Sequence, residues 1–138
     1  MAKVRTGGCL CGAVRYEFAA DVTSIQLCHC TMCRRQGGHA QAAIAVPRAA
    51  FRWTREDGLA WYRSSATARR PFCERCGSAL GFEEDGAASV HPNVGSLDDG
   101  GEGLRLGSHI HVASKGAYYT IDDGLPQFPE GGPDDAAT

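Results

Sequence analysis

The cysteines constrain the fold of this chain more than any other feature. There are seven of them, arranged as a CxC pair, a CxCxxC triplet and a CxxC pair: Cys9 and Cys11; Cys28, Cys30 and Cys33; and Cys73 and Cys76. An odd number cannot be consumed by disulfides, and the start MAKVRTGG lacks the apolar segment of an export signal. We therefore expect a reducing, cytoplasmic location and thiols that bind metal or react.

The two outer pairs have the spacing of a structural zinc site. A CxxC pair followed by glycine, as at Gly77, forms a tight turn that directs both sulfurs at one ion. A CxC pair does so only if the chain bends, and glycines on both sides of the first pair permit a bend. Structural zinc takes four ligands, so one ion is predicted at Cys9, Cys11, Cys73 and Cys76.

The triplet is predicted to hold a second, more labile zinc through Cys28, Cys30 and Cys33. Three protein ligands leave one coordination position open, as in catalytic zinc sites. A thiolate-rich zinc is suited to holding an incoming thiol in its ionised form. The alternative is a closed site completed by one of five histidines: His29, His39, His91, His109 or His111. A disulfide within the triplet is a third interpretation.

Basic side chains near the triplet are candidates for substrate binding. Arg34 and Arg35 follow Cys33 directly, and Lys115 lies further along, so an anionic small thiol is predicted to pair with them. His29 sits between two ligands and is predicted to point away from the metal, with a catalytic role as the weaker interpretation.

The remaining histidines have two interpretations. His39 and His91, like His29, are candidates for a general acid because imidazole titrates near neutral pH. His109 and His111 lie two apart on a predicted strand, so both rings are expected on one face, where they line a cleft or bind metal.

Structural roles are expected for several other polar residues. Asp123 precedes a glycine and is interpreted as a turn former. Arg69 and Arg70 are expected on an exposed strand face, and Tyr118 and Tyr119 are expected to pack, with a cleft-lining role as the alternative.

Local patterns predict one mainly β domain over residues 1–130. The chain has 138 residues, 43% hydrophobic, and 18 glycines, which favour turns over helices. Short helical turns are predicted only at residues 31–36 and 47–50, and two packed sheets are expected. Strands are predicted at residues 14–18, 41–46, 51–54, 78–82 and 109–112. Residues 131–138 lack large apolar side chains and are predicted to form a mobile tail.

Charge and hydropathy exclude two classes of partner. Fourteen basic and 16 acidic residues give a net charge of −2, which does not favour neutralising nucleic-acid phosphates. The longest mostly apolar run, residues 40–47, is far shorter than the roughly 20 residues that span a bilayer. Neither nucleic acid nor membrane is predicted as a partner, and the oligomeric state is left open.

The motifs as a set resemble the glutathione-dependent formaldehyde-activating enzyme family, which includes centromere-protein-V-like proteins. The resemblance covers roughly residues 7–129 through the segments GGCLCGAVRY, CHCTMCRRQGG, FCERCGSALGF, VHPNVGSLDD and HIHVASKGAYYTIDDGLPQFP. It implies the all-β, tent-like zinc fold shared with guanine-nucleotide-exchange chaperones. It also implies a structural zinc on the two outer pairs and a catalytic zinc on the triplet.

The same resemblance implies a carbon–sulfur lyase activity. The family joins glutathione, a small thiol, to formaldehyde, a small aldehyde, to form S-hydroxymethylglutathione. Two other functions are weighed against it. A non-enzymatic interaction module of the centromere-protein-V type relies on basic extensions, which this chain lacks. Methionine sulfoxide reduction on the same fold uses two CxxC pairs and a metal-free cysteine, and only one CxxC stands alone here.

Overall fold

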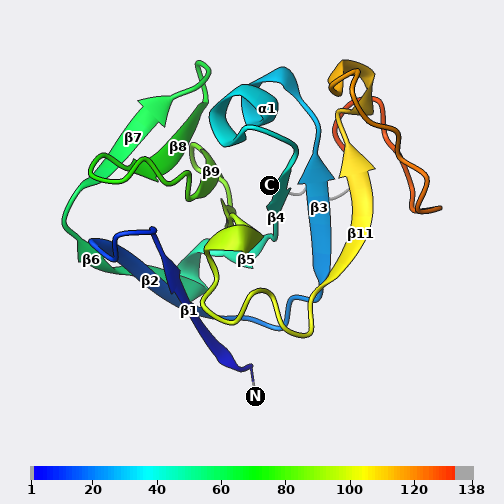
Figure 1. Ribbon diagram of the computed structural model, residues 1–138. Helices are drawn as coiled ribbons and strands as arrows, with labels where there is room; N and C mark the ends of the chain where they lie inside the picture. The colour runs from blue at the N-terminus through cyan, green and yellow to red at the C-terminus, as the bar shows by residue number, and fades with distance from the viewer. Residues whose placement is uncertain (1, 133–138) are drawn as a thin grey trace.

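A computed structural model describes residues 2–132 of the chain. They form eleven strands in three sheets, with one α-helix and three short 3-10 helices (Figure 1). The strands are β1 (Val4–Gly8), β2 (Val14–Ala19), β3 (Ser24–Cys28), β4 (Gln41–Ala43), β5 (Val46–Pro47), β6 (Phe51–Glu56), β7 (Leu59–Arg63), β8 (Ala68–Cys73), β9 (Gly81–Glu84), β10 (Ser89–Pro92) and β11 (Arg105–Ile110). The helices are α1 (Thr31–Gly37), η1 (Arg48–Ala50), η2 (Val94–Ser96) and η3 (Val112–Ser114). The prediction of a mainly β fold with few short helical turns is confirmed.

The β1–β2–β6 sheet carries much of the core. Central β2 pairs antiparallel with both neighbours, and its alternate residues Val14, Tyr16 and Phe18 are buried. The rings of Tyr16 and Phe51 stack with centroids 5.1 Å apart across β2 and β6. Burying side chains of this size contributes roughly 1.5–3 kcal/mol each. This sheet therefore holds the β1–β2 turn, with its cysteine pair, on a rigid base.

The other two sheets place the remaining cysteines. The five-stranded sheet has the order β5-β10-β9-β8-β7, and β8 ends at Cys73. In the third sheet, β3 pairs parallel with β11 and antiparallel with β4. Cys28 is the last residue of β3, and α1 follows two residues later between the β7–β8 hairpin and the β3–β11 pair (Figure 1).

Three sheets replace the two that the sequence predicts. Residues 41–46 are split into β4 and β5 because the first part pairs with β3 and the second with β10. Residues 78–82 are strand only from Gly81, after an isolated bridge at Ala79. β11 ends at Ile110 because His111 has a left-handed backbone, with φ of 55°.

The segment after η3 returns to the third sheet. Phe128 donates its backbone N–H to the carbonyl of His109 at 2.9 Å, and His111 donates to Glu130 at 2.8 Å. Gly132 is buried against Ile110 and Phe128. Of the tail predicted over residues 131–138, positions 133–138 lie outside the described residues. Within residues 2–132, no helix is both long and apolar enough to cross a membrane.

Candidate metal centres

The outer cysteine pairs meet in a four-cysteine cluster of Cys9, Cys11, Cys73 and Cys76. Their sulfurs all lie within 4.8 Å of one another. The Cys11 sulfur is 3.6 Å from that of Cys9 and 3.8 Å from that of Cys73. Tetrahedral zinc with Zn–S bonds of about 2.3 Å requires sulfurs about 3.8 Å apart. The donor set and its spacing therefore fit a closed zinc site.

Backbone turns and one hydroxyl organise this cluster. Gly77 has a φ of 82° and donates its N–H to the Cys73 carbonyl at 2.7 Å, which closes the turn between the paired sulfurs. The hydroxyl of Ser78 accepts the N–H of Leu10 at 2.9 Å and contacts the Cys76 sulfur at 3.3 Å. Hydrogen bonds from Ser78 lower the pKa of the Cys76 thiol to about 5. Cys76 is thus prepared to be a thiolate at neutral pH.

The triplet forms a separate three-cysteine cluster of Cys28, Cys30 and Cys33. Cys28 ends β3, Cys30 is the N-cap of α1, and the Cys30 sulfur accepts the backbone N–H of Cys33 at 3.2 Å. All three sulfurs lie within 4.8 Å of one another. Within residues 2–132, no histidine nitrogen or carboxylate oxygen completes this group as a fourth ligand. The arrangement fits a metal held by three thiolates.

The thiols of this cluster differ in their pKa values. Hydrogen bonding with Cys30 and Cys33, together with burial, raises the pKa of the Cys28 thiol well above its ordinary value. Hydrogen bonding with Cys28 and Cys33 lowers the pKa of Cys30, and the positive charge of Arg70 adds to that effect. Cys30 is therefore the first thiol of the cluster to ionise.

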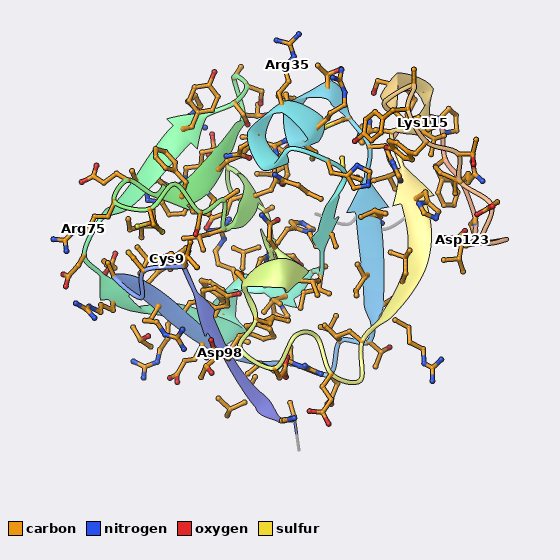
Figure 2. The ribbon with its side chains drawn as sticks, in the orientation of Figure 1. Cys9, Arg35, Arg75, Asp98, Lys115 and Asp123 are labelled. Carbon is orange, nitrogen blue, oxygen red and sulfur yellow. The ribbon has the colours of Figure 1, made fainter. Side chains whose placement is uncertain are left out.

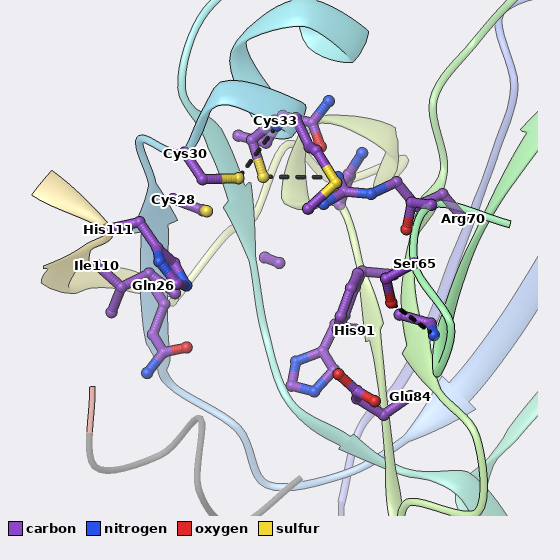
Figure 3. A pocket seen from close by; sticks show the side chains of 17 residues that line it. Gln26, Cys28, Cys30, Cys33, Ser65, Arg70, Glu84, His91, Ile110 and His111 are labelled. Carbon is purple, nitrogen blue, oxygen red and sulfur yellow. Dashed lines mark hydrogen bonds between the residues drawn. The ribbon is translucent and has the colours of Figure 1, made fainter. Parts of the chain in front are cut away.

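A cavity of about 330 Å³ opens beside the three-cysteine cluster, and we call it the thiol cavity. It lies between the third sheet and the β8–β9–β10 part of the five-stranded sheet (Figure 3). Its lining includes Cys28, Cys30, Cys33, Arg70, His91 and His111. Ligand pockets commonly enclose about 300–1,000 Å³, so the cavity is large enough for a small substrate.

Arg70 is the main residue that sequence reasoning placed wrongly. It is only 4% exposed, whereas an exposed strand face was expected. Its Nη1 donates to the Cys33 sulfur at 3.5 Å and to the Gln36 side-chain oxygen at 3.3 Å. Strand alternation explains the difference, because Ala68 is buried and position 70 lies on the same face. Strand alternation counted from Ala68 predicts that Arg70 lies on the buried face.

His29 points away from the sulfurs into a buried network. Its Nε2 lies 2.8 Å from Nδ1 of His109, and its Nδ1 lies 2.5 Å from the hydroxyl of Tyr119. Nε2 of His109 lies 2.7 Å from a carboxylate oxygen of Asp123. Asp123 also accepts the N–H of Leu125 at 3.0 Å, so it forms the predicted turn and has this second role. Burial lowers the pKa of His29, which keeps its ring neutral.

The predicted basic residues lie outside the lining of the thiol cavity. Lys115 donates to the carbonyls of Tyr119, at 2.5 Å, and Gly116, at 3.1 Å. Arg35 is exposed on α1 and points outward, whereas Lys115 lies above β11 (Figure 2). Arg34 is half-buried, and its Nε has no hydrogen-bond partner within residues 2–132.

The other predicted histidines are dispersed. His91 is buried, lines the thiol cavity and packs its ring 6.0 Å from that of Phe82. His39 is exposed and hydrogen-bonds the hydroxyl of Tyr118. His111 faces the thiol cavity whereas His109 faces His29, so the two rings predicted to share one face do not.

Comparison with known proteins gives concordant findings. Residues 4–114 match the family model described as glutathione-dependent formaldehyde-activating enzyme. An uncharacterized lyase of Schizosaccharomyces pombe is 24% identical over 132 residues, which covers 85% of this chain and 91% of the relative. The crystal structure of a Rhodobacter sphaeroides protein superposes with a TM-score of 0.56 at 24% identity, covering 89% of this chain and 98% of that one. The structural similarity to the Rhodobacter sphaeroides protein shows a shared fold and carries no statement about function.

Proposed function

This chain belongs to the family of glutathione-dependent formaldehyde-activating enzymes, and from that premise we propose that it is a zinc-dependent carbon–sulfur lyase. Its substrates are adducts of a small thiol with a small aldehyde. The specific reaction is the joining of glutathione and formaldehyde into S-hydroxymethylglutathione, or the reverse. The yeast relative named as a lyase supports this reaction class. A cytoplasmic location, where glutathione and reduced thiols coexist, fits the same proposal.

The observation that carries the proposal is the unequal number of ligands in the two clusters. The four-cysteine cluster offers a complete tetrahedral set, whereas the three-cysteine cluster offers one ligand fewer beside a cavity. Structural zinc sites are closed, and catalytic ones keep a position for substrate or water. We therefore assign stability to the first cluster and chemistry to the second.

The residues of the thiol cavity have separable tasks in this mechanism. Bound zinc supplies a centre that keeps an incoming thiol ionised and nucleophilic near neutral pH. Cys28, Cys30 and Cys33 would hold the ion at the cavity wall, so their own sulfurs are ligands and not nucleophiles. The guanidinium of Arg70 beside Cys33 offsets the negative charge of the thiolates. The cavity walls confine thiol and aldehyde together, which removes much of the entropic cost of their encounter.

The test combines a zinc count with NMR detection of the adduct. Native protein is expected to carry two zinc ions. It should also interconvert free formaldehyde and S-hydroxymethylglutathione faster than the uncatalysed reaction in buffer. The variant Cys33→Ser is expected to carry one zinc and to leave the exchange at the buffer rate. Native protein that holds two zinc ions and accelerates nothing would refute the lyase activity. A native count of one zinc would refute the second site.

A further inference from the structure

Arg70 is a buried cation that has no carboxylate partner within residues 2–132. Its side chain comes from β8 and is 4% exposed, and no salt bridge within residues 2–132 involves it. The ring of Phe82 lies 5.2 Å from its guanidinium carbon. A buried charge is costly unless an opposite charge accompanies it. The three-cysteine cluster, which Nη1 of Arg70 contacts through Cys33, can supply this opposite charge.

Arg70 has N–H donors that make no hydrogen bond within residues 2–132. Three thiolates around a divalent ion carry a net charge of −1, which the guanidinium offsets. Within the described chain, only Nη1 of the three guanidinium nitrogens makes a hydrogen bond, to Cys33 and Gln36. Nε is buried and has no hydrogen-bond partner among residues 2–132. An arginine has five N–H donors, so Arg70 keeps donors that a bound ligand can use.

Arg70 lines two cavities, and a ligand in either one can reach its N–H donors. The residue lines the thiol cavity, and it also lines a neighbouring apolar groove formed with Met32, Tyr62 and Phe72. A substrate sulfur that reaches the cluster through the thiol cavity would share this cavity with the guanidinium. The atom bonded to that sulfur in the proposed reaction is the aldehyde carbon, which carries an oxygen.

We infer that Arg70 is a catalytic residue that binds the aldehyde oxygen as this oxygen becomes negatively charged. The inference rests on the proposed function. As the thiolate sulfur bonds to the carbonyl carbon, the C=O π electron pair moves onto the oxygen. The resulting alkoxide takes a proton from water and becomes the hydroxyl of the adduct. Arg70 donates hydrogen bonds to the alkoxide and lowers its energy.

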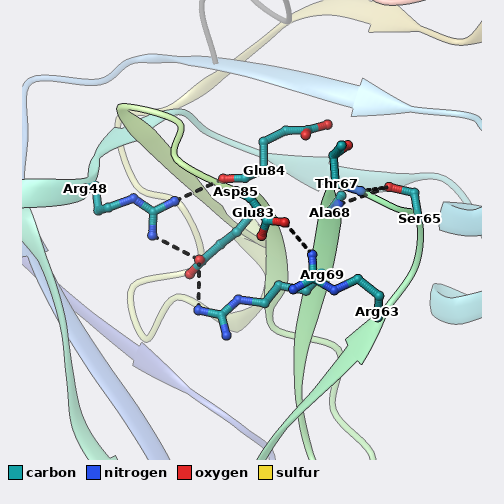
Figure 4. A network of polar contacts seen from close by, with 9 residues as sticks. All are labelled: Arg48, Arg63, Ser65, Thr67, Ala68, Arg69, Glu83, Glu84 and Asp85. Carbon is teal, nitrogen blue, oxygen red and sulfur yellow. Dashed lines mark hydrogen bonds and ion pairs between the residues drawn. The ribbon is translucent and has the colours of Figure 1, made fainter.

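Arg69 is the matched control because it adjoins Arg70 but faces the other way. Its guanidinium carbon lies 3.8 Å from the centre of the Trp61 ring. Its Nη2 lies 3.5 Å from a carboxylate oxygen of Glu83, which Arg48 also contacts at 3.0 Å (Figure 4). It does not line the thiol cavity. Loss of its charge should leave the reaction unchanged.

The experiment compares Arg70→Met, Arg70→Lys and Arg69→Met with native protein, all loaded with zinc. Calorimetry measures the Kd of glutathione, and NMR exchange measures kcat for adduct formation. For Arg70→Met we expect kcat to fall about 10²–10³-fold, as for loss of an oxyanion donor, with the Kd changed less than threefold. Arg70→Lys keeps the charge without the planar fork and should lose about tenfold in kcat. Arg69→Met should match native protein.

Each other outcome has a definite meaning. A native kcat in Arg70→Met would overturn the inference. So would a weakened Kd with an unchanged kcat, because Arg70 would then bind a carboxylate of the thiol. If Arg70→Met fails to fold, the decision passes to Arg70→Lys, where a native kcat overturns the inference. Native protein with no activity refutes the proposed function instead, and the two failures are thus distinguishable.

Discussion

Burial and hydrogen bonding define the role of His29, which lies between two cysteines of the three-cysteine cluster in the sequence. His29 is 1% exposed, and both of its ring nitrogens have partners, His109 and Tyr119. Spacing alone indicates that a residue between two ligands points away from the metal. Its partners could not be predicted, because they lie 80 and 90 residues further along the chain. Folding, and not local sequence, brings Asp123 to the end of this network.

The histidine network predicts a measurable contribution to stability. With both imidazole rings neutral, His109 donates to the Asp123 carboxylate, His29 donates to His109, and the Tyr119 hydroxyl donates to His29. The variant His109→Leu leaves a buried nitrogen of His29 without a partner, which costs about 1–3 kcal/mol. Urea unfolding of the zinc-loaded protein at pH 7 measures this change in free energy.

His39 provides the comparison. It is exposed, and within residues 2–132 its one side-chain hydrogen bond is to Tyr118, so His39→Leu should change the free energy of unfolding by less than about 0.5 kcal/mol. Equal effects of the two substitutions would show that the buried network adds nothing.

Strands with simple alternation were predictable, and strands that change partners were not. The patterns at residues 14–18 and 51–54 correspond to β2 and β6, which lie in one sheet with one buried face. The parallel pairing of β3 with β11 joins segments about 80 residues apart and has no local signature. The left-handed backbone of His111 ends β11 at Ile110, although alternation continues in the sequence.

At the level of single elements, the glycine of the CxxC turn should contribute measurably to stability. Gly77 has a φ of 82°, where a Cβ costs about 1–2 kcal/mol. Nothing lies within 4 Å of the added Cβ, so backbone strain is the only expected cause of destabilisation in Gly77→Ala. Gly95→Ala also meets open space but needs no left-handed backbone, and it should be neutral. Urea midpoints of the two variants test this, and equal midpoints would contradict it.

On the scale of the whole molecule, the two clusters differ in how much chain they join. The four-cysteine cluster connects the β1–β2 turn with the end of β8, and Cys11 and Cys73 are 62 residues apart. The three-cysteine cluster lies within six consecutive residues at the start of α1. A metal that closes a long loop stabilises the fold, whereas one that closes a short segment contributes less. The grouping itself was readable from the spacing of the cysteines.

Single cysteine substitutions should therefore have unequal effects on folding. Cys73→Ser removes a ligand of the cluster that joins two sheets, and we expect at least about 3 kcal/mol of lost stability or an unfolded chain. Cys33→Ser should keep the native near-ultraviolet circular dichroism and lose less stability than Cys73→Ser, because Cys30 remains as a negative partner near Arg70. Thermal unfolding of both variants measures the difference. A Cys33→Ser variant as unstable as Cys73→Ser would mean that both clusters are structural.

The most direct test of the account is the absorption spectrum of cobalt-substituted protein during titration with glutathione. We predict two cobalt ions per native chain and a rise in sulfur-to-cobalt charge-transfer absorption as glutathione supplies a fourth sulfur to the three-cysteine cluster. In Cys33→Ser, one cobalt should remain and glutathione should leave its spectrum unchanged. A native chain that binds a single cobalt, or two whose spectrum does not respond to glutathione, would contradict the account.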